Sequence, residues 1–158
     1  MTNAEITAEP GTQNITVTRE FAASAEQLFR AHTDPDLYAQ WVGPVGYEMN
    51  IQAFESNDGG RWAFTHTNPD GDEFAFRGVF HGKPSVADGI TQTFEFLGYP
   101  GVVSIETLSF EDLGDGRTRL HGHSTFPSVE ARDGMIESGM DKGVNEGYAK
   151  LDGLLAAT

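Results

Sequence analysis

The sequence predicts an α+β domain in which an antiparallel sheet packs against one long C-terminal helix. Between residues 47 and 126, segments of alternating apolar and polar residues are separated by short turns rich in Gly, Pro, Asn and Asp. Strands joined by such short turns must run antiparallel. Residues 129–156 instead repeat their apolar residues at helical spacing. A single helix with one apolar face needs an apolar surface to cover, and the sheet provides it.

The chain is expected to begin with a loose arm, followed by a single domain. Residues 1–13 contain Pro10-Gly11 and show little apolar periodicity, which is typical of a poorly ordered terminus. Residues 15–21 alternate β-branched and polar side chains, which predicts the first strand. The domain is therefore placed at residues 14–158.

Two short helices are expected after the first strand. Ser24 and Gln27 have the spacing of a capping box. Asp34 can cap a second helix, with Pro35 at the first helical position, where its missing N–H costs nothing. Ser128 is expected to cap the long C-terminal helix. The intervening strands are predicted at residues 47–55, 61–67, 73–82, 89–97, 103–112 and 117–126.

Composition excludes several classes of function. The 158 residues include 24 acidic and 10 basic side chains, which gives a formal net charge of −14. Such a chain repels phosphate groups, so neither nucleic-acid binding nor membrane-surface binding is expected. No apolar run approaches the ~18 residues of a membrane span, and the N-terminus lacks a signal-peptide pattern, so we expect a cytoplasmic protein. The chain has no cysteine, which excludes disulfides, thiolate catalysis and thiolate metal ligands. Separately, we expect no cofactor.

Short motifs distributed over residues 14–156 occur in one consistent order. They are Arg19-Glu20-Phe21 followed by residues 25–29; Thr33-Asp34-Pro35 with Trp41 and Gly43-Pro44; Gly59-Gly60-Arg61-Trp62; Pro69-Asp70-Gly71; Arg77-Gly78; Phe110-Glu111-Asp112 with Gly116 and Thr118; and residues 135–139 with Met140 and Gly143. With the order of elements, these motifs resemble the START/Bet v 1-like helix-grip superfamily (SRPBCC), in particular the branch named after the activator of the heat-shock protein 90 ATPase. The resemblance implies a curved antiparallel sheet of six to seven strands wrapped around the C-terminal helix, with a pocket between them.

Strand alternation indicates which side chains face that pocket. The inward sets contain many aromatic residues and four polar ones, His66, Gln92, Glu106 and Ser124. A mostly apolar concave surface with few polar groups is typical of a small-molecule site. The residues expected to bind the ligand are Trp41, Phe64, His66, Phe76, Phe94, Glu106, Met140 and Tyr148.

Three glycines recur every four residues along one flank of the predicted helix, namely Gly139, Gly143 and Gly147. Each costs about 1 kcal/mol relative to alanine inside a helix. They are expected to keep the pocket open or to let another helix approach, so that Gly143→Leu would fill the pocket. The alternative is sequence drift on a tolerant surface flank. Together with the edge strands, this flank also allows a homodimer.

Two histidine arrangements suggest chemistry. If His66 and Glu106 both point inward, the carboxylate could orient the imidazole for proton transfer, or the pair could anchor a ligand. The structural alternative is two core polar groups that satisfy each other or a water. His121 and His123 share one face of a strand with Arg117 and Arg119, and this pattern favours a solvated face over a metal site.

The expected function is therefore the binding of an apolar or aromatic small molecule whose identity the sequence does not give. The first alternative is an enzyme of the cyclase or hydrolase type found elsewhere in the superfamily, with His66 and Glu106 as acid and base. The second is a module that activates a chaperone ATPase. Because the eukaryotic activators use an additional domain for the chaperone, that contact is not expected for this single domain.

Overall fold

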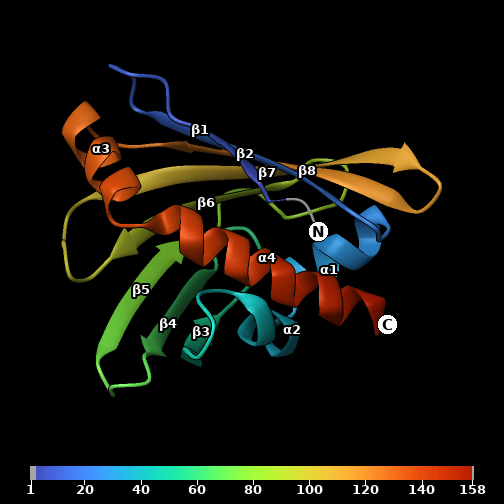
Figure 1. The fold of residues 1–158 in the computed structure, drawn as a ribbon, viewed down its shortest axis with the longest axis horizontal. Coiled ribbons are helices and arrows are strands. Elements are labelled where there is room, and N and C mark those ends of the chain that lie inside the picture. The colour runs from blue at the N-terminus through green and yellow to red at the C-terminus, as the bar shows by residue number, and fades with distance from the viewer. Residues whose placement is uncertain (1–2, 158) are drawn as a thin grey trace.

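The computed structural model describes residues 3–157, which form one eight-stranded antiparallel sheet and four helices (Figure 1). The strands are β1 (Glu5–Thr7), β2 (Asn14–Phe21), β3 (Glu48–Phe54), β4 (Arg61–Thr67), β5 (Glu73–Val79), β6 (Ile90–Phe96), β7 (Val103–Gly114) and β8 (Arg117–Thr125). The helices are α1 (Ala25–Thr33), α2 (Pro35–Trp41), α3 (Val129–Glu137) and α4 (Met140–Ala156). Across the sheet the strands follow the order β1-β2-β8-β7-β6-β5-β4-β3.

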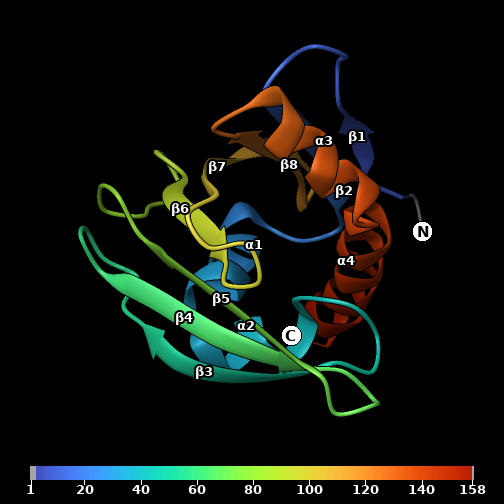
Figure 2. The same cartoon turned by 90° about the vertical axis from the view of Figure 1, so that its left-hand side faces the viewer.

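The sheet curves around the helices and holds α4 on its concave side (Figures 1 and 2). The short helices α1 and α2 lie on the same side, where α2 contacts both α4 and β3. The expected helix-grip architecture is thus confirmed, with both short helices after the first long strand. The sheet has one strand more than the six to seven expected, because the N-terminal arm contributes β1.

The expectation of a loose arm is wrong for residues 5–7. These residues pair with β2, so that Ile6 lies opposite Val17. Farther along the arm, the buried guanidinium of Arg132 in α3 donates from Nη1 to the carbonyl oxygens of Glu9 (3.0 Å) and Asn14 (3.1 Å). A strand of three residues is too short for alternation to be recognised in a sequence. Residues 1–2 of the expected arm lie outside the described residues, as does Thr158 at the end of the expected domain.

The expectation of one helix over residues 129–156 is also wrong. The helix α3 ends at Glu137, and α4 begins at Met140. Between them, Gly139 has a φ angle of 84°, a left-handed conformation that glycine adopts at little steric cost. The break was hidden in the sequence because the apolar spacing from Ile136 to Met140 fits an uninterrupted helix.

The predicted caps of the two short helices are confirmed. The Ser24 hydroxyl accepts a hydrogen bond from the Gln27 amide (3.2 Å), and the Ser24 amide donates to the Gln27 side chain (2.9 Å). Asp34 caps α2 by accepting from the Asp36 amide (2.9 Å), with Pro35 at the helix start. These two caps satisfy backbone amides at the starts of α1 and α2.

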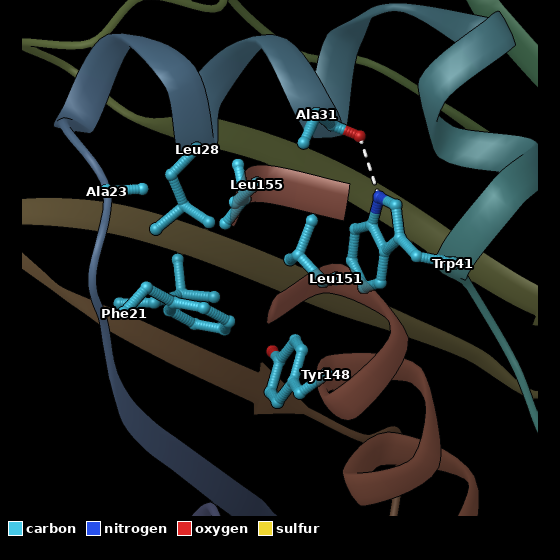
Figure 3. Packing of buried hydrophobic residues seen from close by; sticks show 9 residues of the cluster. Phe21, Ala23, Leu28, Ala31, Trp41, Tyr148, Leu151 and Leu155 are labelled. Atoms are coloured by element: carbon cyan, nitrogen blue, oxygen red, sulfur yellow. Dashed lines mark hydrogen bonds between the residues drawn. The ribbon is translucent and has the colours of Figure 1, made fainter. Parts of the chain in front are cut away.

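The buried apolar residues form two clusters. In the first (Figure 3), the Trp41 indole donates to the Ala31 carbonyl (2.9 Å) and stacks on Tyr148 of α4, with ring centroids 5.9 Å apart. The second cluster is centred on β4, β5 and β6, and its fully buried members are Trp62, Phe64, Phe80 and Ile90. The first cluster closes the space under α4, and the second lies toward the other half of the sheet.

A buried ion pair joins the sheet to α4. The Arg19 guanidinium of β2 binds both carboxylate oxygens of Asp152, at 2.8 and 2.6 Å. The same guanidinium lies over the Phe21 ring, 4.5 Å from its centroid. Because the Arg19 side chain is 4% exposed and that of Asp152 17%, removing either partner would leave a largely buried charge.

The helix α4 also lies directly against the segment that follows α2. A β-carbon added at Gly147 would come within 3.0 Å of the Trp41 carbonyl oxygen and 3.4 Å of the Gly43 nitrogen. On either side of this contact, Glu146 accepts from the Val45 amide (2.8 Å) and Lys150 donates to the Pro44 carbonyl (3.3 Å). Gly147 therefore allows a close backbone approach that a larger residue would prevent.

Two alanine substitutions in α4 are expected to have opposite effects on stability. Gly153 has no heavy atom within 4 Å of an added β-carbon, so Gly153→Ala is expected to raise the free energy of unfolding by up to about 1 kcal/mol. Gly147→Ala is expected to lower it, because the backbone of residues 41–43 must move away. Urea denaturation of both variants measures the difference. An equal gain in both would contradict the proposed role of Gly147.

The buried His32 is expected to make stability depend on pH. Burial between Trp41 and Phe110 lowers its pKa from 6.5 to about 4. Below pH 6.5 the unfolded chain binds a proton that the folded protein rejects, so stability is lost as the pH falls from 6.5 to 4. At about 1.4 kcal/mol per pH unit, this loss reaches about 3 kcal/mol.

The measurement compares urea denaturation at pH 7 and pH 4.5 for the wild type and for His32→Leu. The wild type is expected to lose more stability than the variant between the two pH values. Replacing the exposed His123 by leucine provides the control, since that change is expected to leave the pH dependence as it is in the wild type.

Candidate functional site

The inner face of β4, β5 and β6 carries a continuous set of aromatic rings. Phe64 of β4 lies 5.2 Å from Phe76 of β5, and Phe76 lies 5.5 Å from Phe94 of β6, measured between ring centroids. The His66 ring joins this set, 4.9 Å from Phe64. The structure thus brings together four of the expected ligand-binding residues: Phe64, His66, Phe76 and Phe94.

His66 is held by the segment that follows α2. Its Nε2 lies 3.2 Å from the Val42 carbonyl oxygen, to which it donates when that nitrogen carries the proton. Burial lowers the pKa of the imidazole. The ring occupies the position where a side chain at Gly43 would be, so Gly43, with a φ of 98°, is required on both steric and conformational grounds. His66 therefore fixes this segment against β4.

Glu106 lies on the same inner face as His66 but on a different strand, β7. The Gln92 amide nitrogen of β6 donates to Glu106 Oε1 at 3.0 Å, and Ser124 of β8 also hydrogen-bonds its carboxyl group. Burial nevertheless raises the pKa of this carboxyl, which favours its neutral form. The three polar side chains form one line across β6, β7 and β8.

The residues that the structure describes show no contact between His66 and Glu106. Two strands, β5 and β6, lie between β4 and β7, which separates the backbones by about 14 Å. Each side chain has hydrogen-bond partners of its own. Strand alternation correctly placed both residues on the inner face, but it cannot give the distance between two strands that are not neighbours.

Trp41 and Tyr148 belong to the closed part of the core. Trp41 is 6% exposed and Tyr148 9%, and their rings stack (Figure 3). The edge of Phe21 meets Tyr148 at a centroid distance of 5.3 Å. Trp41 therefore belongs to the buried core beside the candidate site and does not line it. Tyr148 extends from α4 toward the sheet.

Tyr38 is a site residue that the sequence reasoning missed. It lies on α2, with ring contacts to Phe54 (5.1 Å), Phe64 (6.1 Å) and Trp41 (5.9 Å). Burial and the nearby Glu106 carboxyl raise the pKa of its hydroxyl, and the same two causes raise the pKa of Tyr148. The sequence signal was its spacing of three residues from Trp41, which puts both on one face of a short helix.

Met140 and the glycine flank do not lie over these rings. Met140 lines a surface groove formed by the arm and the α3–α4 junction, together with residues such as Ile6 and Asn145. Gly143 faces Pro44, whose Cγ would lie 3.6 Å from an added β-carbon. Because Gly143 faces Pro44 and not the rings, a leucine at this position would not fill the space beside them, contrary to the expectation from the sequence. The helical glycines instead allow the close packing of α4 on residues 41–44.

A second surface hollow lies between α1, α2 and the end of α4. Its lining residues are Gln27, Arg30, Ala31, Leu37, Leu154 and Leu155. None of the expected ligand-binding residues belongs to it.

Part of the inner face is nevertheless left uncovered. In the middle of the sheet, inward residues keep part of their surface accessible, whereas Phe64, Phe80 and Ile90 are at most 3% exposed. We call this area the open inner face; it comprises Val17, Phe76, Gln92, Phe94, Glu106, Leu108, Gly122 and Ser124. Strand register makes it continuous, because Leu108 pairs with both Ile90 and Gly122, and Glu106 with both Gln92 and Ser124.

The outer face of β8 is a charged surface, as the sequence predicted. His121 and Arg119 both bind the Glu111 carboxylate of β7, at 2.9 and 3.1 Å. Within residues 3–157, no group of three or more histidine or acidic side chains could hold a metal ion. None of the helices in that part of the chain is long and apolar enough to cross a membrane.

Solved structures of bacterial proteins are similar to this chain over nearly its whole length. A protein from Rhodobacter sphaeroides is 28% identical, with a TM-score of 0.88, and the match covers 99% of this chain and all of that one. A protein from Arthrobacter aurescens is 26% identical, with a TM-score of 0.86 and coverages of 98% and 92%.

A third similarity concerns the fold alone. A protein from Silicibacter pomeroyi that is named AHSA1 is 23% identical, with a TM-score of 0.72 over 91% of this chain and 98% of its own. No curated protein matches this chain with statistical significance. Residues 22–156 match the family described as Activator of Hsp90 ATPase homolog 1-like protein. The resemblance expected from the sequence is confirmed, and the chain belongs to this family.

Proposed function

We propose that this domain binds an apolar or aromatic small molecule on the open inner face of its sheet, beside α4. The observation that carries the proposal is the partial exposure of inward-facing apolar residues, above all Phe76 and Phe94. A ligand that covers these rings would gain about 25 cal/mol for each Å² of apolar surface removed from water.

The chemistry of the surface also favours a ligand. Aromatic rings surround a short line of polar groups, formed by Gln92, Glu106 and Ser124. Small-molecule sites typically combine a large apolar area with a few fixed polar groups that orient the ligand. Glu106 is half-buried on this inner face, and burial raises the pKa of its carboxyl.

The alternative enzymatic function with His66 and Glu106 as acid and base has less support. His66 is engaged with the Val42 carbonyl, and Glu106 with Gln92 and Ser124. The hypothesis needs the Glu106 carboxylate to orient the His66 imidazole, and the two strands between β4 and β7 place them too far apart for that. We also propose that the protein is cytoplasmic and that its ligand binds without a metal or cofactor.

The test uses the neutral fluorescent dye N-phenyl-1-naphthylamine and the variant Gly122→Leu. A dye that buries about 330 Å² of apolar surface gains about 8 kcal/mol, which corresponds to a Kd on the order of 1 μM. Gly122 lies between Val17 and Leu108 on the open inner face, and an added β-carbon would meet Leu108 at an ordinary 3.4 Å. A leucine there is expected to occupy the site and weaken dye binding about tenfold or more, because ~1.4 kcal/mol of lost contact is a factor of ten.

The control is His123→Leu, which adds a leucine to the opposite face of the same strand, where the side chain is exposed. It is expected to leave the dye affinity unchanged. Circular dichroism confirms that each variant is folded, and Leu108→Phe provides a second filling variant. Equal dye affinity in the wild type, Gly122→Leu and Leu108→Phe would refute binding at this surface.

A further inference from the structure

The open inner face contains one ionisable side chain, the carboxyl of Glu106 on β7. Within residues 3–157, none of the ion pairs includes this carboxyl. The basic residue on the inner side of β2, Arg19, is engaged by both oxygens of Asp152. A carboxylate removed from water without a counter-ion costs free energy. The site is therefore complementary to a cation that the ligand would supply.

Two neighbouring side chains hold the Glu106 carboxyl in place on the sheet. Strand register sets Gln92 of β6 and Ser124 of β8 directly beside it. Gln92 Nε2 donates to Glu106 Oε1 at 3.0 Å, and the Ser124 hydroxyl also hydrogen-bonds the carboxyl. An ionised carboxylate has about four acceptor positions, so two donors leave room for a third. All three side chains keep part of their surface accessible, which leaves the remaining positions within reach of a ligand.

Aromatic rings lie close to this carboxyl on the same face of the sheet. Phe94 follows Gln92 by two residues on β6, so it is the diagonal neighbour of Glu106 across the strand pair. Such neighbours lie roughly 7–8 Å apart, within reach of long side chains. Phe76 of β5 adjoins Phe94, with 5.5 Å between the ring centroids. A ligand whose amino group is one carbon away from an aromatic ring can therefore reach Glu106 while its ring lies on the phenylalanines.

The charge distribution favours a cationic ligand over an anionic one. The negative face of an aromatic ring attracts a cation, and the net charge of −14 draws cations toward the protein. Burial raises the pKa of the Glu106 carboxyl, and no basic side chain within residues 3–157 opposes this effect. A ligand cation beside the carboxyl would stabilise its ionised form, whereas a ligand carboxylate would be repelled by it.

We propose that Glu106 binds the protonated amino group of an aromatic amine whose ring lies on Phe76 and Phe94. Gln92 and Ser124 position the carboxyl for this contact. This inference rests on the proposed function and adds the chemical class of the ligand. It also gives a role to the one ionisable group of the open inner face, whose charge no residue of the described chain pairs.

The experiment compares 1-(aminomethyl)naphthalene with 1-ethylnaphthalene, which have nearly the same shape and differ in an ammonium against a methyl group. The amine is protonated at neutral pH, as the side chain of lysine is. Each probe displaces N-phenyl-1-naphthylamine from the full-length protein in about 0.3 M salt, which screens the long-range effect of the net charge. A purely apolar surface would favour the hydrocarbon, because the ammonium must be stripped of water. The wild type is expected to favour the amine by about threefold or more, since hydrogen bonds between charged groups are the stronger ones.

Glu106→Gln keeps the size of the side chain and removes its charge. It is expected to lower the ratio of amine to hydrocarbon affinity about tenfold or more, the usual effect of one hydrogen bond to a charged group. The affinity for ethylnaphthalene is expected to stay nearly the same. The variant is expected to fold, because the glutamine carbonyl can still accept from Gln92 or Ser124. Glu106→Met is a second variant without a carboxyl and is expected to lower the ratio likewise.

The matched control is Glu111→Gln, which removes one negative charge from the opposite face of the same strand, where the side chain is 49% exposed. It is expected to leave the affinity ratio unchanged. If the dye binds but the wild type favours the hydrocarbon, or if the Glu106 variants keep the wild-type ratio, this inference is overturned and ligand binding itself stands. An equal drop in Glu111→Gln would also overturn it, because the preference would then reflect the net charge. If the dye does not bind the wild type at all, the proposed function is overturned and this inference with it.

Discussion

The close contact between α4 and the segment after α2 determines how the rest of the molecule is arranged. At Gly147 the helix comes within van der Waals distance of the Trp41 carbonyl, which leaves no room for a side chain. Glu146 and Lys150 bind backbone groups on both sides of this point, and Trp41 stacks on Tyr148 directly beside it. Together these contacts hold α4 at one height above the sheet.

That height divides the inner face into a closed and an open part. Where Phe21, Leu120 and Leu151 meet, the side chains are fully buried and α4 lies tightly on the sheet. Toward β5 and β6 the sheet curves away from the helix, as Figure 2 shows, and its rings pack mainly on one another. The first part is therefore closed by α4, whereas Phe76 and Phe94 in the second part keep some accessible surface.

The polar residues of the interior fall into two groups with different physical roles. Arg19 and His66 have partners on neighbouring elements, and His32 has its partner, the Leu28 carbonyl, within α1, so the polarity of all three is used within the fold. Glu106, by contrast, hydrogen-bonds across the sheet to the neighbouring strands, through Gln92 of β6 and Ser124 of β8, and burial raises the pKa of its carboxyl.

The sequence by itself determined the class of fold, the family and the face on which most side chains lie. Capping boxes, turns and strand alternation depend on residues close together in the chain, so Ser24, Asp34 and the inward position of Phe64 or Glu106 could be predicted locally. The aromatic part of the site followed from the same alternation, because Phe64, Phe76 and Phe94 lie on adjacent strands.

Only the tertiary structure decided which inward residues meet. His66 and Glu106 share a face but lie on strands separated by two others, and Tyr38 reaches Phe54 and Phe64 of the sheet from the helix α2. The pairing of residues 5–7 likewise depends on contact with a distant strand, β2. Periodicity specifies the direction of a side chain relative to its own element, whereas distances between elements arise from packing.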